Sequence, residues 1–174
     1  KRGRTAINDF FTRTYGETLW TRAAVHDWLK AICPSYVIDL NRDTQLLASY
    51  ADQPHYLVQG CARITGRSYR FNLYRHDGRS YAKIQPEDAT PDLPVLFKPL
   101  GTPQPEPSYI ASDADYVDYI TELMGGFGVP AFVKKMRRDK RYLFIGLRLD
   151  RDTERMIMSD LIHAAAPAAG WARC

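Results

Sequence analysis

The chain has 174 residues, of which 45% are hydrophobic and 25% are charged, and its formal net charge is +4. This composition is typical of a folded globular protein and excludes a chain that is mainly disordered. No apolar run approaches the roughly 18 residues of a membrane-spanning helix, so no membrane association is expected. The small positive charge is compatible with an anionic ligand but gives no reason to expect a nucleic-acid partner.

The three cysteines, Cys33, Cys61 and Cys174, lie far apart and include no Cys-x-x-Cys pair. They predict neither a disulfide framework nor a zinc site, and a reducing, cytoplasmic compartment is the simpler expectation. The chain begins at Lys1 with neither a methionine nor an apolar signal segment. We expect one domain over residues 1–174, either alone or as a fragment of a longer parent chain.

Helices and strands alternate in the first part of the chain. An apolar stripe at helical spacing predicts a helix over residues 20–32, and an apolar run predicts a short buried strand over residues 36–40. The elements predicted for this part are helices at 5–15 and 20–32, the strand at 36–40, a helix opened by Asp43-Thr44 and a strand at 55–58.

Residues 68–84 have a different pattern, in which aromatic and polar side chains alternate on one side of Asp77-Gly78 and a shorter apolar segment returns on the other. Alternation beside an Asp-Gly turn predicts a β-hairpin with one dry and one wet face. Two Pro-rich loops follow, and residues 94–98 between them predict another strand.

The third part of the chain opens with a strong helix signal. Ser112 is followed three residues later by Asp115, which is the pattern of a capping box, and Gly125-Gly126 is a suitable helix end. The remaining predicted elements are a short basic helix from Pro130, a strand at 141–146 with the strongest strand pattern of the chain, and a final helix from Asp152.

Strands separated by helices indicate βαβ units. We therefore predict an α/β, Rossmann-type, three-layer fold with a mostly parallel sheet, into which the hairpin at 68–84 is inserted. Ligands of such sheets bind at the carboxyl ends of the strands, so the residues that follow the predicted strands are the candidate site.

Three strand ends carry polar residues or glycine. Asn41 and Asp43 follow the first strand, and they suit a ribose hydroxyl or a water as well as a turn and a helix cap. Gly101 follows the second strand, where it permits close approach of a ligand, although its spacing favours a rigid Pro/Gly turn. Gly146 and Arg148 follow the third, where Arg148 suits a phosphate and an exposed loop explains both residues equally well.

The common phosphate-binding loops are absent at these strand ends. No strand leads into a GxGxxG or GxxxxGK[ST] sequence, and no GxSxG elbow is present. The four histidines have no partner at a metal-ligand spacing, so no metal site is predicted.

Taken together, the three strand ends resemble those of the sirtuin-like superfamily, whose Rossmann-type domains bind NAD or its ADP-ribose part. The matching segments, which span roughly residues 20–165, are Asn41-Arg42-Asp43 for the family's Asn-x-Asp element, Lys98-Pro99-Leu100-Gly101 for its strand and His-Gly pair, and residues 142–150 for its apolar strand and Ser-Leu-x-Asp-like loop. The pattern is most similar to the sirtuin-like proteins encoded in nitrogen-fixation gene clusters of bacteria.

The resemblance implies binding of NAD or a related ADP-ribosyl nucleotide, with NAD glycohydrolase activity as the reaction. It implies Asn41 as the catalytic residue, and as binding residues Asn41, Asp43, Gly101, Gly146 and Arg148. The chain departs from the family at Asp39, where the family has threonine or glutamine, and in lacking a zinc-binding cysteine quartet. It also departs in two further respects: the Gly-Ala-Gly-x-Ser strand is missing, and Leu100 stands where the family has histidine. Because leucine cannot act as a general base, sirtuin deacylase activity is not expected.

The same two departures favour an alternative hypothesis from another class. In this hypothesis the chain is a non-catalytic regulatory or assembly module that binds a protein partner. Its contact surfaces would be the hairpin at 68–84 or the basic run at 134–141, although a basic run is also typical of a solvated helix face.

Overall fold

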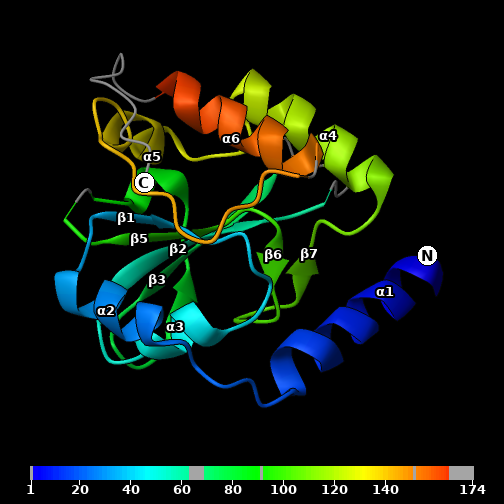
Figure 1. Cartoon of the computed structure of the whole chain (residues 1–174), viewed down its shortest axis with the longest axis horizontal. Helices are drawn as coiled ribbons and strands as arrows, with labels where there is room; N and C mark the ends of the chain where they lie inside the picture. The colour runs from blue at the N-terminus through cyan, green and yellow to red at the C-terminus, as the bar shows by residue number, and fades with distance from the viewer. Residues whose placement is uncertain (1, 63–68, 91, 151, 165–174) are drawn as a thin grey trace.

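The structure is a computed structural model that describes residues 2–62, 69–90, 92–150 and 152–164 (Figure 1). Residue 68 of the predicted hairpin and Cys174 lie outside the described residues. None of the helices in the described ranges combines the length and the apolar character needed to cross a bilayer.

The chain forms a mixed α/β structure around a five-stranded sheet with the order β1-β5-β2-β3-β4. The strands are β1 (Tyr36–Ile38), β2 (His55–Gly60), β3 (Phe71–His76), β4 (Tyr81–Lys83) and β5 (Val95–Lys98). β1, β5 and β2 are parallel neighbours, whereas β2, β3 and β4 are antiparallel neighbours. The predicted hairpin is confirmed as β3 and β4, and it extends the main sheet because β3 pairs with β2.

The helices begin and end close to their predicted positions. They are α1 (Arg2–Thr12), α2 (Ala24–Ile32), α3 (Gln45–Ser49), α4 (Asp113–Gly125), α5 (Ala131–Met136) and α6 (Asp152–Ala164). A π-helical turn at Arg13–Glu17 follows α1, and a 3-10 turn occupies Pro86–Asp88. Within the predicted Pro-rich loop, β6 (Gly101–Thr102) pairs with β7 (Ser108–Tyr109), a small sheet that sequence reasoning missed.

The buried strands separate two apolar cores, because successive side chains of a strand point to opposite faces. Tyr56 and Val58 of β2 belong to the core beneath α4, α5 and α6, whereas Leu57 belongs to the core beneath α2 and α3. Figure 1 accordingly shows α4 and α6 on one side of the sheet and α2 and α3 on the other. A sheet covered on both faces explains why every residue of β2 and β5 is buried.

The predicted limits of α4 are confirmed in detail. The hydroxyl of Ser112 accepts a hydrogen bond from the amide of Asp115 at 3.2 Å, and a carboxylate oxygen of Asp115 accepts one from the amide of Ser112 at 3.0 Å. Gly126 follows the helix with φ of +91°, the left-handed conformation that glycine adopts without strain.

The predicted strand at 141–146 is wrong. These residues form no strand, and the side chain of Leu143 is 73% exposed. Aromatic and β-branched residues favour a strand only where a neighbouring strand supplies hydrogen bonds and a surface to pack against. Here the segment joins α5 to α6 as irregular backbone and pairs with no strand, so its strand-like sequence lacks that partner.

Candidate functional site

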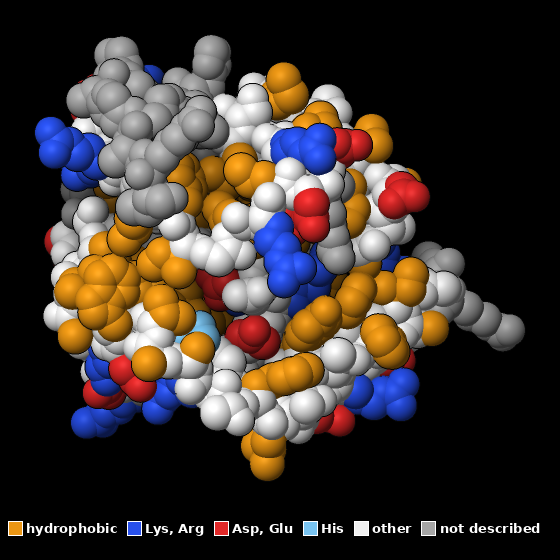
Figure 2. Space-filling model, in the orientation of Figure 1, with side chains coloured by type: hydrophobic (Ala, Val, Ile, Leu, Met, Phe, Trp, Pro, Cys, Tyr) orange, Lys and Arg blue, Asp and Glu red, His pale blue; other side chains and the backbone are white. Residues whose placement is uncertain are grey.

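A cleft of about 720 Å³ lies along the edge strand β1 and continues past its carboxyl end to the loop of residues 39–43. One wall consists of α2, β1 and the loop of residues 39–43, and the other consists of residues 140–148. Figure 2 shows a hollow near the middle of this face, where acidic and basic side chains meet between hydrophobic ones. The volume is within the range of about 300–1,000 Å³ that is usual for small-molecule sites.

Four of the five predicted site residues line this cleft, namely Asn41, Asp43, Gly146 and Arg148, and Leu100 lines it too. The first two follow β1, whereas the second two lie in the irregular segment far along the chain. The fold thus brings together two of the three strand ends chosen from the sequence.

Gly101, by contrast, is not among the residues that line the cleft. Its φ is +85°, and a Cβ atom placed on it would lie 1.9 Å from the carbonyl oxygen of Ser108. The backbone that approaches Gly101 is therefore that of β7, the partner strand of β6. Gly146 differs, since its φ is +68° and a Cβ atom there would have nothing within 4 Å.

The loop of residues 39–43 is held by its own carboxylates. A carboxylate oxygen of Asp39 accepts a hydrogen bond from the amide of Asn41 at 2.9 Å, and one of Asp43 accepts a hydrogen bond from the amide of Gln45 at 2.9 Å. The second bond closes a turn before α3. The sequence favoured Asp43 as the cap of this helix, but the N-cap residue is Thr44, which makes no side-chain cap hydrogen bond. The side chain of Asn41 is exposed, and no hydrogen bond to its amide group is found within the described ranges.

Lys98, which sequence reasoning did not select, lies directly beneath this loop. Its side chain is fully buried, and its ammonium group donates to a carboxylate oxygen of Asp39 at 2.7 Å and to the carbonyl oxygen of Asp43 at 2.8 Å. A signal was present in the sequence, because a lysine at the end of an otherwise apolar strand must find anionic or carbonyl partners if it is buried.

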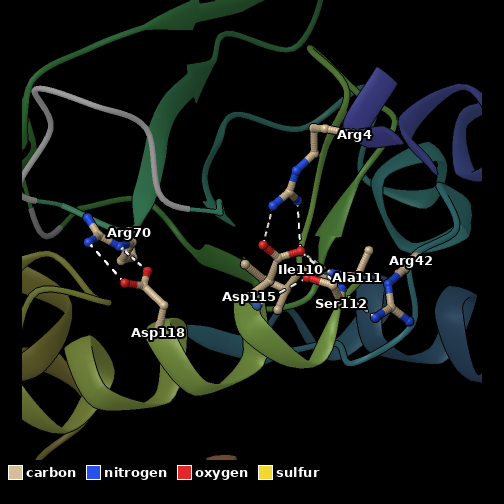
Figure 3. Close-up of polar contacts among 8 residues, drawn as sticks. All are labelled: Arg4, Arg42, Arg70, Ile110, Ala111, Ser112, Asp115 and Asp118. Carbon is tan, nitrogen blue, oxygen red and sulfur yellow. Dashed lines mark hydrogen bonds and ion pairs between the residues drawn. The ribbon is translucent and has the colours of Figure 1, made fainter. Parts of the chain in front are cut away.

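Arg42 ties the loop to the start of α4. Its guanidinium donates to the carbonyl oxygen of Ile110 at 2.7 Å and to the hydroxyl of Tyr116 at 2.5 Å, and it lies 5.2 Å from the centre of the Phe11 ring of α1. The start of α4 is in turn bound to α1, because Arg4 donates to the carboxylate of Asp115 at 2.7 Å. Figure 3 shows Arg4 and Arg42 reaching the start of α4 from different elements.

The carboxylate of Asp115 is the common acceptor in that cluster. Burial raises the pKa of Asp115, but hydrogen bonds from Arg4, Ser112 and Ala111 outweigh burial, so the pKa lies below its usual value. Farther along α4, Asp118 accepts a hydrogen bond at 2.6 Å from the buried Arg70, and this bond raises the pKa of the arginine (Figure 3). Both contacts hold α4 against elements from distant parts of the chain.

The opposite wall of the cleft supplies positive charge. Arg148 is exposed, and no hydrogen bond to its guanidinium is found among the described residues. Lys140 and Arg141 lie on the same wall, where Asp150 and Glu154 add negative charge. The rings of Trp28, Tyr36, Tyr142 and Phe144 also line the cleft. Cationic, amide, carboxylate and aromatic groups therefore surround one space.

The two predicted protein-contact surfaces are less exposed than the sequence suggested. In the run at 134–141, Arg137 is buried, and the ammonium group of Lys134 donates to the carbonyl oxygen of Gly126, the residue that follows α4. In the hairpin, β3 is buried along its length except at Arg75. The expectation of one wet and one dry face for the hairpin is therefore wrong for β3. Phe71 and Leu73 pack into the core beneath α4, α5 and α6. On the opposite face Asn72 donates to Gln59 of β2, and Tyr74 donates to Glu106 between β6 and β7.

Comparisons with protein-family models, with curated proteins and with solved structures found no match to this chain. Within the described residues, no group of three or more His, Cys, Asp or Glu side chains is arranged to hold a metal ion. The interpretation of the cleft depends on its geometry and on the sequence motifs that line it.

Proposed function

We propose that the cleft binds NAD or a related ADP-ribosyl nucleotide. The observation that carries this proposal is that Asn41, Asp43 and Arg148 line one cleft, and that Asn41 and Asp43 follow the carboxyl end of the parallel strand β1. Ligands of parallel α/β sheets bind at this position, since the strands end there and the loops leave room. The proposal includes a Rossmann-type layout for the parallel part of the sheet and the kinship with sirtuin-like proteins of bacterial nitrogen-fixation clusters.

The side chains of the cleft match the three parts of such a ligand. Arg148 has a guanidinium available for a phosphate, and a guanidinium binds phosphate oxygens in pairs. Asn41 and Asp43 offer amide and carboxylate groups to the hydroxyls of a ribose. An aromatic wall that includes Trp28 and Phe144 suits stacking of a planar base.

The proposed reaction, where one occurs, is hydrolysis of the glycosidic bond of NAD. Asn41 would orient the attacking water or the nicotinamide ribose, because its side chain is exposed at the cleft. Leu100 also lines the cleft, and an aliphatic side chain accepts no proton. The proposal therefore leaves out deacylation by a histidine base.

Replacing Arg148 by glutamate tests the proposed phosphate contact. We expect the Arg148→Glu variant to bind ADP-ribose about 10-fold to 100-fold more weakly, because a hydrogen bond to a charged group contributes about 1.5–3 kcal/mol. Isothermal titration calorimetry with NAD and with ADP-ribose on the full chain measures the change.

The matched control is Arg79→Glu, which makes the same charge change at an exposed residue beside the β3–β4 turn, outside the cleft. Its affinity for ADP-ribose should equal that of the unmodified protein. Absence of heat with both nucleotides, together with absence of turnover that depends on Asn41, would refute the proposed function.

A protein partner is the second candidate. It is favoured by a group of exposed basic side chains that follow α5, namely Arg138, Lys140 and Arg141, of which the last two also line the cleft. A pull-down from nitrogen-fixing cells, repeated with Arg138→Glu, tests this surface: recovery of the same partner in unchanged amount contradicts it. Arg137 is unsuitable for the test because its burial makes charge reversal a change in stability.

A further inference from the structure

We infer that Lys98 is a positioning residue of the cleft, whose buried ammonium group fixes both ends of the loop of residues 39–43 and thereby presents Asn41 to the ligand. The part of this inference that concerns a ligand rests on the proposed nucleotide function. The part that concerns the loop stands on the hydrogen bonds of the unliganded protein.

The first step is the reach of Lys98 to both ends of the loop. Lys98 is the last residue of β5, and β5 lies between β1 and β2, so its side chain is fully buried. Its ammonium group contacts Asp39 through a carboxylate oxygen at 2.7 Å and Asp43 through the carbonyl oxygen at 2.8 Å. One charged group therefore holds the first and the last residue of the loop.

The second step is the transmission of this contact to Asn41. One carboxylate oxygen of Asp39 accepts from Lys98, which leaves the other to accept from the amide of Asn41 at 2.9 Å. The bond from Lys98 orients the carboxylate, and the carboxylate orients the backbone of Asn41. The side chain of Asn41 stays exposed at the cleft, as a side chain that meets a ligand must be.

The third step is that stability alone gives little reason for this ion pair. Taking an ammonium group and a carboxylate out of water is costly, and apolar residues of similar size often stabilise a protein equally well or better. A charged clamp does what an apolar pair cannot, because its hydrogen bonds have direction. A loop ordered before the ligand arrives avoids paying the ordering entropy on binding.

The test replaces both charges together in the full chain. The double variant Lys98→Met/Asp39→Leu leaves no buried charge without a partner, so it should fold with a melting temperature close to that of the unmodified protein. We expect the amide of Gln45, whose acceptor Asp43 is left in place, to exchange hydrogen at least 10-fold faster in the unliganded variant. We also expect its dissociation constant for ADP-ribose, measured by calorimetry, to rise at least 10-fold.

Lys30→Met is the matched control. The ammonium group of Lys30 contacts the carboxylate of Asp52 at 2.7 Å, but Lys30 is partly exposed and does not line the cleft. This variant should leave both the exchange rates and the affinity unchanged. The comparison with Lys30→Met therefore distinguishes a positioning role of Lys98 from the general effect of losing an ion pair.

The outcomes distinguish the two proposals. Unchanged exchange at Gln45 in the folded double variant overturns the role of Lys98. Faster exchange with unchanged affinity in a protein that binds ADP-ribose overturns the link between the clamp and the ligand. Failure of the unmodified protein to bind ADP-ribose overturns the nucleotide function alone, and the exchange rates still decide whether Lys98 orders the loop.

Discussion

The Gly101→Ala variant should lose about 3 kcal/mol or more of its free energy of unfolding. A Cβ atom at this position would lie 1.9 Å from the carbonyl oxygen of Ser108, and the backbone has φ of +85°. Rotation of a side chain cannot relieve the clash, because the neighbouring atom belongs to the backbone of β7. Urea unfolding followed by circular dichroism measures the loss.

Gly146→Ala is the natural comparison, since this glycine also has a positive φ but faces open space. Its cost should be only the strain of the left-handed conformation, about 1 kcal/mol. Equal losses in the two variants would contradict the close approach of β6 and β7. Calorimetry on the same pair adds a functional readout, because a ligand that passes close to the backbone at Gly146 should bind the Gly146→Ala variant more weakly.

Mild acid should destabilise the protein between about pH 6.5 and pH 4 through His55. The imidazole is fully buried, with Nδ1 2.8 Å from the carbonyl oxygen of Gln53 and Nε2 2.8 Å from the hydroxyl of Tyr81. Nδ1 must donate to the carbonyl, so Nε2 accepts from the tyrosine, and both bonds suit the neutral ring. Burial lowers the pKa of His55 to about 4 and raises the pKa of Tyr81, which keeps that hydroxyl protonated.

The sign of the effect follows from proton binding. Below its ordinary pKa of about 6.5, the histidine of the unfolded chain takes up a proton, whereas His55 of the folded protein stays neutral until about pH 4. The unfolded state then binds more protons, so the free energy of unfolding falls as the pH falls, by up to about 3 kcal/mol over this window. Unfolding curves in urea at half-unit pH steps would measure it.

His55→Gln removes the titrating group and is the control for the slope. The variant should be less stable at every pH, but the fall between pH 6.5 and pH 4 should be smaller by the contribution of His55. Parallel pH profiles for the two proteins would exclude this role. The carboxylate of Asp115 does not account for a fall in stability over this window. Its pKa lies below the usual value, so its contribution to the free energy of unfolding is lost only at lower pH.

Local signals predicted the local structure well. The pairing of Ser112 with Asp115, the glycine after α4 and the Asp77-Gly78 turn each involve residues a few positions apart. The strand at 141–146 was predicted from the same kind of pattern, but a strand also needs a neighbour that its own residues do not specify. The pairing of β6 with β7 was missed for the related reason that a Pro-rich segment rarely predicts strands.

The site was predictable in part. Asn41 and Asp43 were found because they follow a parallel strand of the sheet. Arg148 also lines the cleft, although the strand that was expected to place it there does not form. The role of Gly101 could not be read from the sequence, since a glycine does not reveal which backbone approaches it. Lys98 was missed because its partner Asp39 lies 59 residues away, and only the pairing of β1 with β5 brings the two together.

The two halves of the sheet differ in the chain separation of their contacts, and this difference bears on the order of folding. His76 pairs with Tyr81 within the β3–β4 hairpin. Tyr36 of β1 pairs with Val95 of β5, and the chain forms β2, β3 and β4 between these two residues. Contacts between near neighbours lose less entropy on closure, so we expect β2, β3 and β4 to form first and β1 to dock last.

The cleft is built on β1, the strand that should dock last. Pulse-labelled hydrogen exchange during refolding would detect the sequence of events, with amides of β3 protected before those of β1; simultaneous protection would contradict it. We expect an element that docks late to open most readily in the native state. A ligand that binds β1 only in its closed state would shift the equilibrium between closed and locally open forms toward the closed form. Saturation of the cleft should therefore slow proteolysis of the chain between β1 and α3 before it alters the rest of the molecule.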